Sequence, residues 1–279
     1  MTERLAAALE RALPELRVRP LRTLDVGFGS TVVETADGVV VRVARTARAA
    51  AGHERELALL PALAGRLPAA VPDPRWRLPP DDELPFGAIA YPKLPGAPLA
   101  PAAADDAVAE DVAAFLRALH AIDARVPPAE DDLEALRAAT TPVLWEELDP
   151  AELEEVDAWW EDVLADARLR AYRPVLRHGD LWYDNLLVDR GRLVGVVDWE
   201  AAGLGDPAED FAALRHVGDR FVRTVLAAYG AQDPDLPHRI ERRWQLRELY
   251  GVRLAVELGD AAELADAVRK LRAGPVLGR

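Results

Sequence analysis

Residues 176–200 read LRHGDLWYDNLLVDRGRLVGVVDWE, and this stretch decides which fold the chain can adopt. Two short apolar runs, LLV and LVGVV, stand on either side of the turn signal DRGR at residues 189–192. Apolar runs separated by such a turn predict a β-hairpin. The hairpin would return Asp198, at the end of its second strand, to a position beside Asn185, just before its first strand.

The polar side chains around this hairpin suit one kind of chemistry. Asp180 and Asn185 are separated as Asp-x-x-x-x-Asn, which is the spacing of a kinase catalytic loop. Asp180 is then free to orient a hydroxyl group, whereas the carboxylate of Asp198 and the amide oxygen of Asn185 face a common point. Hard oxygen ligands of this kind suit Mg²⁺ that carries a nucleotide polyphosphate. The alternative interpretation is a solvated, Asp-rich loop beside an ordinary hairpin.

A longer set of motifs extends this pattern. They occur in the order HGDLWYDN from His178, VDWE from Val197 and GDP from Gly205, followed by Asp210. Together they resemble the aminoglycoside phosphotransferase family, which is related to protein kinases and includes macrolide, viomycin-type, choline and fructosamine kinases. The resemblance implies an α+β, bilobal, protein-kinase-like fold, with a small β-rich nucleotide lobe at residues 1–92 and a larger helical lobe at 93–279. It also implies that His178 supports the catalytic loop, while Asp206, followed by Pro207, is placed to cap the next helix.

The N-terminal third contains a pattern typical of a nucleotide-binding lobe. Two predicted strands, 18–26 and 31–34, enclose the turn Gly-Phe-Gly-Ser. In the family that the chain resembles, such a unit covers the nucleotide phosphates, because glycine permits close backbone approach and free N–H groups can meet phosphate oxygens. Gly27, Gly29 and Ser30 are therefore candidate nucleotide-binding residues. An ordinary hairpin is the alternative explanation of the same turn.

A basic residue lies in the next predicted strand, residues 39–43. Arg42 stands between valines, where a charge is poorly placed unless it has a partner. The resemblance implies a Lys at this place, which contacts the α- and β-phosphates and pairs with a helical Glu; Arg can bind phosphate but has a different reach. In the predicted helix 47–65, Glu56 matches the pairing residue better than Glu54. An exposed Arg on an edge strand is the alternative.

A further predicted strand, residues 86–91, ends at the sequence Pro-Lys-Leu-Pro-Gly. In the family resemblance this is the linker between the lobes, where backbone groups of residues 90–93 meet the nucleotide base. Tyr91 and Lys93 are the candidate residues. The same Pro and Gly punctuation also fits a plain domain boundary.

The charge of the chain is concentrated in one segment. The net charge is −14, and residues 101–170 alone contain 19 acidic side chains against 5 arginines, so the remainder is neutral. Such a segment repels nucleic acid and anionic membrane surfaces and attracts cations. The chain has no cysteine, no apolar run of membrane-spanning length and no secretory signal at its start. We therefore expect a cytoplasmic protein, either a monomer or a homodimer.

Helices are predicted for residues 3–13, 108–122 and 133–170, the last with a possible break at 140–142. Residues 221–229 and 239–272 are also predicted to be helical, with short breaks at Gly230 and Gly259. Trp145, Trp159 and Trp160 stand among the acids of the third helical region. This pattern fits amphipathic helices with acidic solvent faces. It equally fits a cleft wall that attracts a cationic substrate through charge and cation–π contacts.

The segment after Asp198 lacks the long activation loop and the Ala-Pro-Glu sequence of protein kinases, which favours a small-molecule acceptor. The function implied is transfer of the γ-phosphate of ATP or GTP, with Mg²⁺, to a hydroxyl of a cationic acceptor: an aminoglycoside, a viomycin-type peptide or a macrolide. A metabolite kinase acting on choline, an amino sugar or a fructosamine, and a nucleotide-binding pseudokinase, are the alternatives. A metal-dependent hydrolase would need further metal ligands.

Overall fold

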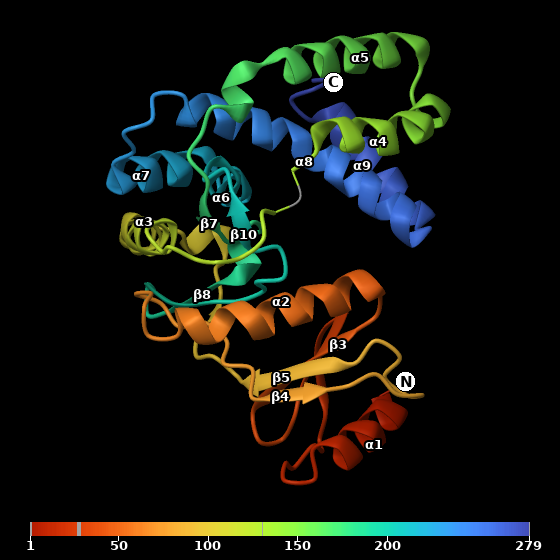
Figure 1. Ribbon diagram of the computed structural model, residues 1–279, viewed down its shortest axis with the longest axis vertical. Coiled ribbons are helices and arrows are strands. Elements are labelled where there is room, and N and C mark those ends of the chain that lie inside the picture. The colour runs from red at the N-terminus through yellow and green to blue at the C-terminus, as the bar shows by residue number, and fades with distance from the viewer. Residues whose placement is uncertain (1, 27–28, 130, 279) are drawn as a thin grey trace.

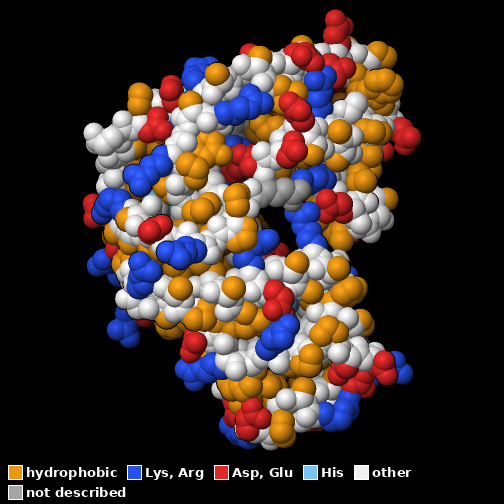
Figure 2. All heavy atoms as spheres, in the orientation of Figure 1, with side chains coloured by type: hydrophobic (Ala, Val, Ile, Leu, Met, Phe, Trp, Pro, Cys, Tyr) orange, Lys and Arg blue, Asp and Glu red, His pale blue; other side chains and the backbone are white. Residues whose placement is uncertain are grey.

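The computed structural model describes residues 2–26, 29–129 and 131–278. Its elements form two parts, one built on a β-sheet and the other mainly helical (Figure 1). The predicted α+β architecture, with a small β-rich N-terminal part and a larger helical C-terminal part, is confirmed. Figure 2 shows that the surface is hollowed between these two parts.

The sheet of the N-terminal part has five antiparallel strands in the order β1-β2-β3-β5-β4. The strands are β1 (Arg22–Val26), β2 (Ser30–Glu34), β3 (Val39–Ala44), β4 (Trp76–Leu78) and β5 (Ala88–Pro92). β1 begins at Arg22 and not at the predicted residue 18, because Pro20 has no N–H to donate to a strand ladder. Val18 is instead buried in the core beneath the sheet.

Two helices complete this part. Alternate valines of β3 share a core with helix α1 (Thr2–Ala12), in which Leu9 is fully buried. Helix α2 (Ala47–Leu63) begins at the capping residue Thr46, whose side chain accepts a hydrogen bond from the N–H of Ala49. It lies between the sheet and the helical part (Figure 1). Residues carried by α2 can therefore reach both parts.

The predicted hairpin is confirmed as strands β8 (Leu186–Asp189) and β9 (Arg192–Val196), with Asp189 opposite Arg192. β6 (Ala97–Pro98), which follows the last strand of the large sheet, pairs with β8. Ala70, which follows α2, donates its N–H to the carbonyl of Val194 at 3.0 Å and accepts the N–H of Val196 at 2.9 Å. The hairpin is thus joined by backbone hydrogen bonds to both segments that leave the first part. This change of strand partner supports a lobe boundary after residue 92, which stays a prediction.

The helical part surrounds two apolar cores. One contains Phe115, Trp199 and Phe211, and the other contains Trp160. The helices are α3 (Asp106–His120), α4 (Leu133–Glu147), α5 (Pro150–Ala165), α6 (Ala208–Ala213), α7 (Asp219–Tyr229), α8 (Leu236–Leu258) and α9 (Ala261–Ala273). Short 3₁₀ turns occupy Pro101–Ala103, Ala167–Arg170, Tyr183–Asn185 and Leu214–His216, and β7 (Val175–Arg177) pairs with β10 (Gly203–Gly205).

The ends of these helices test the predicted breaks. Gly230 and Gly259 end α7 and α8 at φ angles of 69° and 64°, as predicted, since glycine enters the left-handed region without strain. The predicted break at residues 140–142 is wrong. Helix α4 continues through Pro142, and the break falls at Asp149, which starts α5 with a complete capping box. No helix in the described ranges is long and apolar enough to cross a membrane.

Candidate active site

The loop after β7 contains the first candidate residues, and the fully buried carboxylate of Asp210 holds it in place. The Asp210 oxygens accept the backbone N–H of His178 at 3.1 Å and that of Gly179 at 2.7 Å. His120 contacts the same carboxylate at 3.1 Å and Tyr229 at 3.0 Å. Asp210 was part of the sequence motif but had no predicted role; it anchors the loop. His120, at the end of α3, therefore supports this carboxylate.

His178 lies at the centre of this loop. Its Nε2–H donates to the carbonyl of Val197 at 3.0 Å, its Nδ1 accepts the N–H of Asp180 at 3.3 Å, and its ring packs edge-on against Trp199. Burial lowers the pKa of His178, despite the opposing charges of Asp210 and Asp198, so the ring is neutral. A neutral ring that donates on one side and accepts on the other joins the loop to the end of the hairpin.

Asp180 and Asn185 face each other across the loop. The side-chain amide of Asn185 donates to the backbone carbonyl of Asp180 at 2.8 Å and to its carboxylate at 3.1 Å. This leaves Asn185 Oδ1 as the amide atom able to bind a cation. Asp180 is exposed to solvent, although protein atoms crowd around its carboxylate. This enclosure, and the charges of Asp198 and Glu200, raise the pKa of Asp180 to about 7.

Asp198 follows β9 and is brought to the same place. The N–H of Val197 donates to the backbone carbonyl of Asn185 at 3.0 Å, which sets the start of this turn beside the loop. Asp198 itself has a φ of 65°, a left-handed conformation that is uncommon for a residue with a side chain and is concentrated at functional sites. Its carboxylate accepts a hydrogen bond from Arg42 at 2.7 Å. The structure therefore brings Asp180, Asn185 and Asp198 together.

Arg42, Glu56, Asp198 and Glu200 form an ion cluster between the two parts, which we call the cleft cluster. Arg42 donates from Nη1 to Glu56 at 2.5 Å, and from Nη2 to Asp198 at 2.7 Å and Glu200 at 3.0 Å. The alternative of an exposed Arg on an edge strand is wrong, because β3 is an inner strand and the Arg42 side chain is only 5% exposed. Glu54 points away from the cluster and pairs with Arg77.

The cleft cluster contains more negative than positive charge. Partial burial and the neighbouring Asp198 raise the pKa of Glu200 to about 7, although Arg42 acts in the opposite direction. Burial also raises the pKa of Glu56. Carboxylates that resist ionisation together indicate a place where a cation would be stabilised.

The remaining predicted residues of the nucleotide lobe are spread more widely. Gly27 lies outside the described residues. Gly29 lies close to Glu200, whereas the hydroxyl of Ser30 is buried and contacts His53 at 3.1 Å. Tyr91 is buried on β5, where burial raises its pKa. Lys93 is turned away: its N–H donates to Gly38 at 2.9 Å and its ammonium pairs with Glu34.

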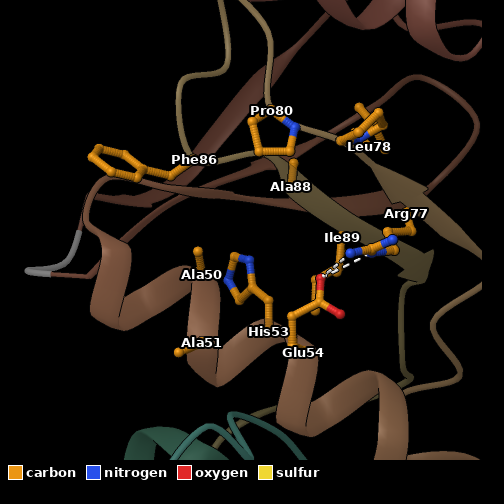
Figure 3. Close-up of a pocket in the computed structure, with 11 residues that line it drawn as sticks. Ala50, Ala51, His53, Glu54, Arg77, Leu78, Pro80, Phe86, Ala88 and Ile89 are labelled. Carbon is orange, nitrogen blue, oxygen red and sulfur yellow. Dashed lines mark hydrogen bonds and ion pairs between the residues drawn. The ribbon is translucent and has the colours of Figure 1, made fainter.

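A small cavity of about 190 Å³ lies on the other side of α2 (Figure 3). His53 and Glu54 of α2 face β4 and β5 across it, and the Glu54–Arg77 ion pair closes one end. Burial lowers the pKa of His53 to about 4, so the ring is neutral. The imidazole stands between this cavity and Ser30, and the polar groups around the cavity are already paired.

A second ion cluster, which we call the support cluster, lies behind the loop. Asp206 is fully buried and pairs with the fully buried Arg239 at 3.0 Å. Its side chain accepts the N–H of Ala208 at 3.0 Å, but α6 begins at Ala208 with Pro207 at the cap position, one residue later than predicted. Arg177 and Arg243 both bind Glu209, at 2.9 Å and 3.3 Å. The members of the support cluster are Arg177, Arg239, Arg243, Asp131, Asp206, Asp233 and Glu209.

The donor set fits a magnesium ion. Asn185 Oδ1 and the Asp198 carboxylate are hard oxygen ligands, and Mg²⁺ commonly takes only one or two protein ligands with phosphate and water completing its shell. Within the described ranges, no group of three or more His, Cys, Asp or Glu side chains is placed to hold a metal ion. The larger ligand set that a metal-dependent hydrolase requires is therefore not found among these residues.

The fold and this site define a kinase-like protein. The sequence profile of the phosphotransferase enzyme family matches residues 21–244, and the chain belongs to that family. The resemblance noted from the motifs is confirmed.

Known relatives agree with this assignment. Viomycin phosphotransferase of Streptomyces vinaceus is 38% identical over 100 residues, which are 34% of this chain and 35% of that protein. An aminoglycoside 3′-phosphotransferase of Escherichia coli is 32% identical over 148 residues, 46% of this chain and 51% of that protein. The chain thus spans between a third and a half of the length of these relatives.

Solved structures extend the similarity over nearly the whole chain. Macrolide 2′-phosphotransferase MphH from Brachybacterium faecium has a TM-score of 0.73 at 28% identity, covering 96% of this chain and 98% of that one. The GDP complex of aminoglycoside 2′-phosphotransferase-IIIa has a TM-score of 0.86 at 20% identity, covering 97% of each chain. The latter likeness shows the shared fold.

Proposed function

We propose that this protein transfers the γ-phosphate of ATP or GTP to a hydroxyl group of a small-molecule acceptor. The observation that carries the proposal is the convergence of Asp180, Asn185 and Asp198 at the end of one hairpin, facing the Arg42–Glu56 pair from the other part of the molecule. Phosphoryl transfer depends mainly on positioning and on neutralising charge, and these residues provide both.

Each residue has a proposed role. Asp180 orients the acceptor hydroxyl and takes up its proton, for which a carboxylate with a raised pKa is suited. Asn185 and Asp198 hold Mg²⁺, which when bound neutralises the phosphate charge. Arg42 binds phosphate while Glu56 fixes its position. His178 keeps the loop in place.

The glycine turn and the linker have weaker support. Gly27 and Gly29 are proposed to cover the phosphates through their backbone, with Ser30 contributing from its backbone because its hydroxyl is bound to His53. Tyr91 and Lys93 are proposed to lie near the nucleotide base. The Lys93 N–H already donates to Gly38, so only its carbonyl is available for a base.

We propose a cationic antibiotic as the acceptor. The relatives named above are phosphotransferases of viomycin, aminoglycosides and macrolides. On α4 and α5, some acids are paired with arginines, as Asp162 is with Arg242 and Glu152 with Arg272. Others stand at exposed positions 134, 146, 147 and 154 and keep the surface acidic. The charge excess supports a cationic acceptor and argues against nucleic acid or an anionic membrane as a partner.

The tryptophans divide between the two predicted interpretations. Trp160 is fully buried and Trp159 donates to Gln245, so both belong to the packing of amphipathic helices. Trp145 is 65% exposed and lines an open groove of about 640 Å³ with Arg137 and Leu164. Of these three tryptophans, Trp145 has the ring that is most exposed for a cation–π contact with an acceptor. We further propose that the protein acts as a monomer or homodimer in the cytoplasm, where its nucleotide substrate is found.

The test is a panel of acceptors with ATP and with GTP, followed by identification of the product. A phosphorylated aminoglycoside, viomycin-type peptide or macrolide supports the proposal. Phosphorylation of choline, an amino sugar or a fructosamine alone would identify a metabolite kinase. Nucleotide binding with no product would indicate a pseudokinase, and release of free phosphate alone a hydrolase.

The residue assignment is tested separately with Asp180→Ala. Turnover should fall by about 10²–10⁴-fold, the usual contribution of a positioned general base, while nucleotide affinity is retained. Asp184→Asn is the matched control, because Asp184 is exposed on the same loop and has no proposed role. Equal turnover of Asp180→Ala and the control would remove Asp180 from its assigned role.

A further inference from the structure

Glu200 shares a single nitrogen atom of Arg42 with Asp198. Nη2 of Arg42 donates to Asp198 at 2.7 Å and to Glu200 at 3.0 Å, while Nη1 is occupied by Glu56. Three carboxylates therefore surround one guanidinium group. No role for Glu200 follows from the proposed function described above.

The three carboxylates are not equivalent. Glu56 is fully buried, and its Oε1 also accepts the backbone N–H of Trp199 at 2.7 Å, so it is fixed from both sides. The side chains of Asp198 and Glu200 are each 37% exposed. Asp198 therefore has room to leave Arg42, whereas Glu56 does not.

Residues of the N-terminal part leave room for Glu200 and contact it. Gly52 lies inside α2, where glycine is unfavourable by about 1 kcal/mol relative to Ala. A Cβ atom at Gly52 would lie 2.7 Å from the Cβ of Glu200, and one at Gly29 would lie 3.6 Å from its carboxylate. The guanidinium of Arg55 binds the backbone carbonyl of Glu200. Gly52 costs α2 some stability but leaves room for the Glu200 side chain, which indicates that the position of Glu200 matters.

We propose that Glu200 is a positioning residue that holds Arg42 when Asp198 turns to the metal ion. With Glu200 present, Arg42 keeps two carboxylate partners after Asp198 leaves, and Asp198 is released at little electrostatic cost. Without it, Asp198 is the only movable partner of a buried guanidinium and stays paired. Glu200 thus lowers the Mg²⁺ concentration at which nucleotide binds. This inference rests on the proposed function.

The experiment measures nucleotide binding by calorimetry at increasing Mg²⁺ concentration, without an acceptor, so that turnover plays no part. For Glu200→Gln the Mg²⁺ concentration at half-saturation should rise by about fivefold or more, within the range of coupling between neighbouring charges. Affinity for ATP in the presence of EDTA should not fall. Glu54→Gln is the matched control, because Glu54 lies on the other face of the same helix and pairs with Arg77.

A direct metal ligand would produce the same rise, and a second experiment separates the two roles. The chain has no cysteine, so an introduced thiol is the sole thiol in the protein. Asp198→Cys should bind nucleotide better with Cd²⁺ than with Mg²⁺, because thiolates prefer soft metals. Glu200→Cys should show no preference for Cd²⁺ and should share the raised Mg²⁺ requirement of Glu200→Gln. A Cd²⁺ preference in Glu200→Cys would make Glu200 a ligand and overturn the proposal.

A third variant reduces the space around Glu200 and leaves Glu200 itself unchanged. Gly52→Ala would place a Cβ atom 2.7 Å from the Cβ of Glu200, so Glu200 must shift; the variant should raise the Mg²⁺ requirement and lose up to about 1–3 kcal/mol of stability. This variant keeps the test decisive if the Glu200 variants fail to fold. If the wild type binds Mg²⁺-nucleotide and these variants have an unchanged Mg²⁺ requirement, the inference about Glu200 is refuted, but the proposed function is not. If the wild type binds no nucleotide, the proposed function fails, and this inference fails with it.

Discussion

The cleft cluster and the support cluster are both built from arginines and acids, yet they differ in charge balance and burial. The cleft cluster has one arginine for three carboxylates, and two of those carboxylates are 37% exposed. The support cluster has three arginines for four acids, and its central pair, Asp206 with Arg239, is fully buried. The difference suggests that the first cluster is completed by a cationic ligand, whereas the second is nearly balanced in charge without one.

The largest effect is expected for Asp198→Asn in the cleft cluster. Loss of this ligand should reduce turnover by about a thousandfold or more, since a bound metal ion contributes several kcal/mol to catalysis. Mg²⁺-nucleotide affinity, measured by calorimetry, should fall with it. Asn tolerates the left-handed conformation of this residue, so stability to urea should be nearly unchanged. Unchanged Mg²⁺-nucleotide affinity would contradict the assignment of the cleft cluster as a cation site.

For Asp206→Asn in the support cluster, we expect a loss of stability and no change in nucleotide affinity. The amide can still accept the N–H of Ala208, but Arg239 loses its buried partner, and breaking a buried ion pair costs about 3–5 kcal/mol. Urea unfolding should show this loss of stability. At a temperature where the variant is folded, its nucleotide affinity should match the wild type. If nucleotide affinity falls and stability does not, the division between the two clusters is wrong.

A smaller, pH-dependent effect is expected at Asp210, which joins the loop to the helical core. Burial opposes its ionisation, but hydrogen bonds from His120 and the Gly179 N–H outweigh it and hold the pKa of Asp210 below its usual range. The stabilisation is therefore complete above the unfolded-state pKa of about 4 and is lost as the pH falls through the folded-state pKa. Below pH 4 the wild type should lose up to about 1.4 kcal/mol per pH unit more than Asp210→Asn. Urea unfolding between pH 6 and 3 measures this, and parallel curves would contradict it.

The smallest effect is expected for Arg48→Ala, which removes an ion pair between α2 and α8. Arg48 contacts Glu257 at 2.7 Å, but the two side chains are 57% and 41% exposed. Exposed pairs contribute less than about 1 kcal/mol and are screened by salt. Thermal unfolding at low and high salt is the measurement. A loss as large as that of Asp206→Asn would show that burial does not set the strength of these pairs.

The sequence was sufficient for the features that depend on neighbouring residues. The hairpin at 189–192 and the glycine ends at Gly230 and Gly259 follow from local backbone preferences, and the structure confirms them. The prediction of a break at residues 140–142 relied on the same local preferences and was wrong. Proline is tolerated inside α4, while the stronger start signal lies at Asp149.

The contacts within the site depend on residues far apart in the chain, and the sequence alone revealed fewer of them. Arg42 meets Glu200 across 158 positions, and Arg243 meets Asp131 across 112. No periodic pattern encodes such pairs, so Glu200 and the members of the support cluster other than Asp206 went without roles. Arg42 emerged as a candidate because strand alternation left it without an apparent partner, and Glu56, only 14 positions away, because it matched the pairing Glu that the family resemblance implied.

The hairpin is bonded to the segments on both sides of the large sheet, through β6 and through Ala70. Any rocking of the sheet relative to the helices must therefore turn about the same strands that present Asn185 and Asp198. The proposed metal ligands therefore lie close to the axis of any such motion. Opening of the cleft would separate Arg42 and Glu56 from Asp198, while Asn185 and Asp198 would keep their positions relative to each other.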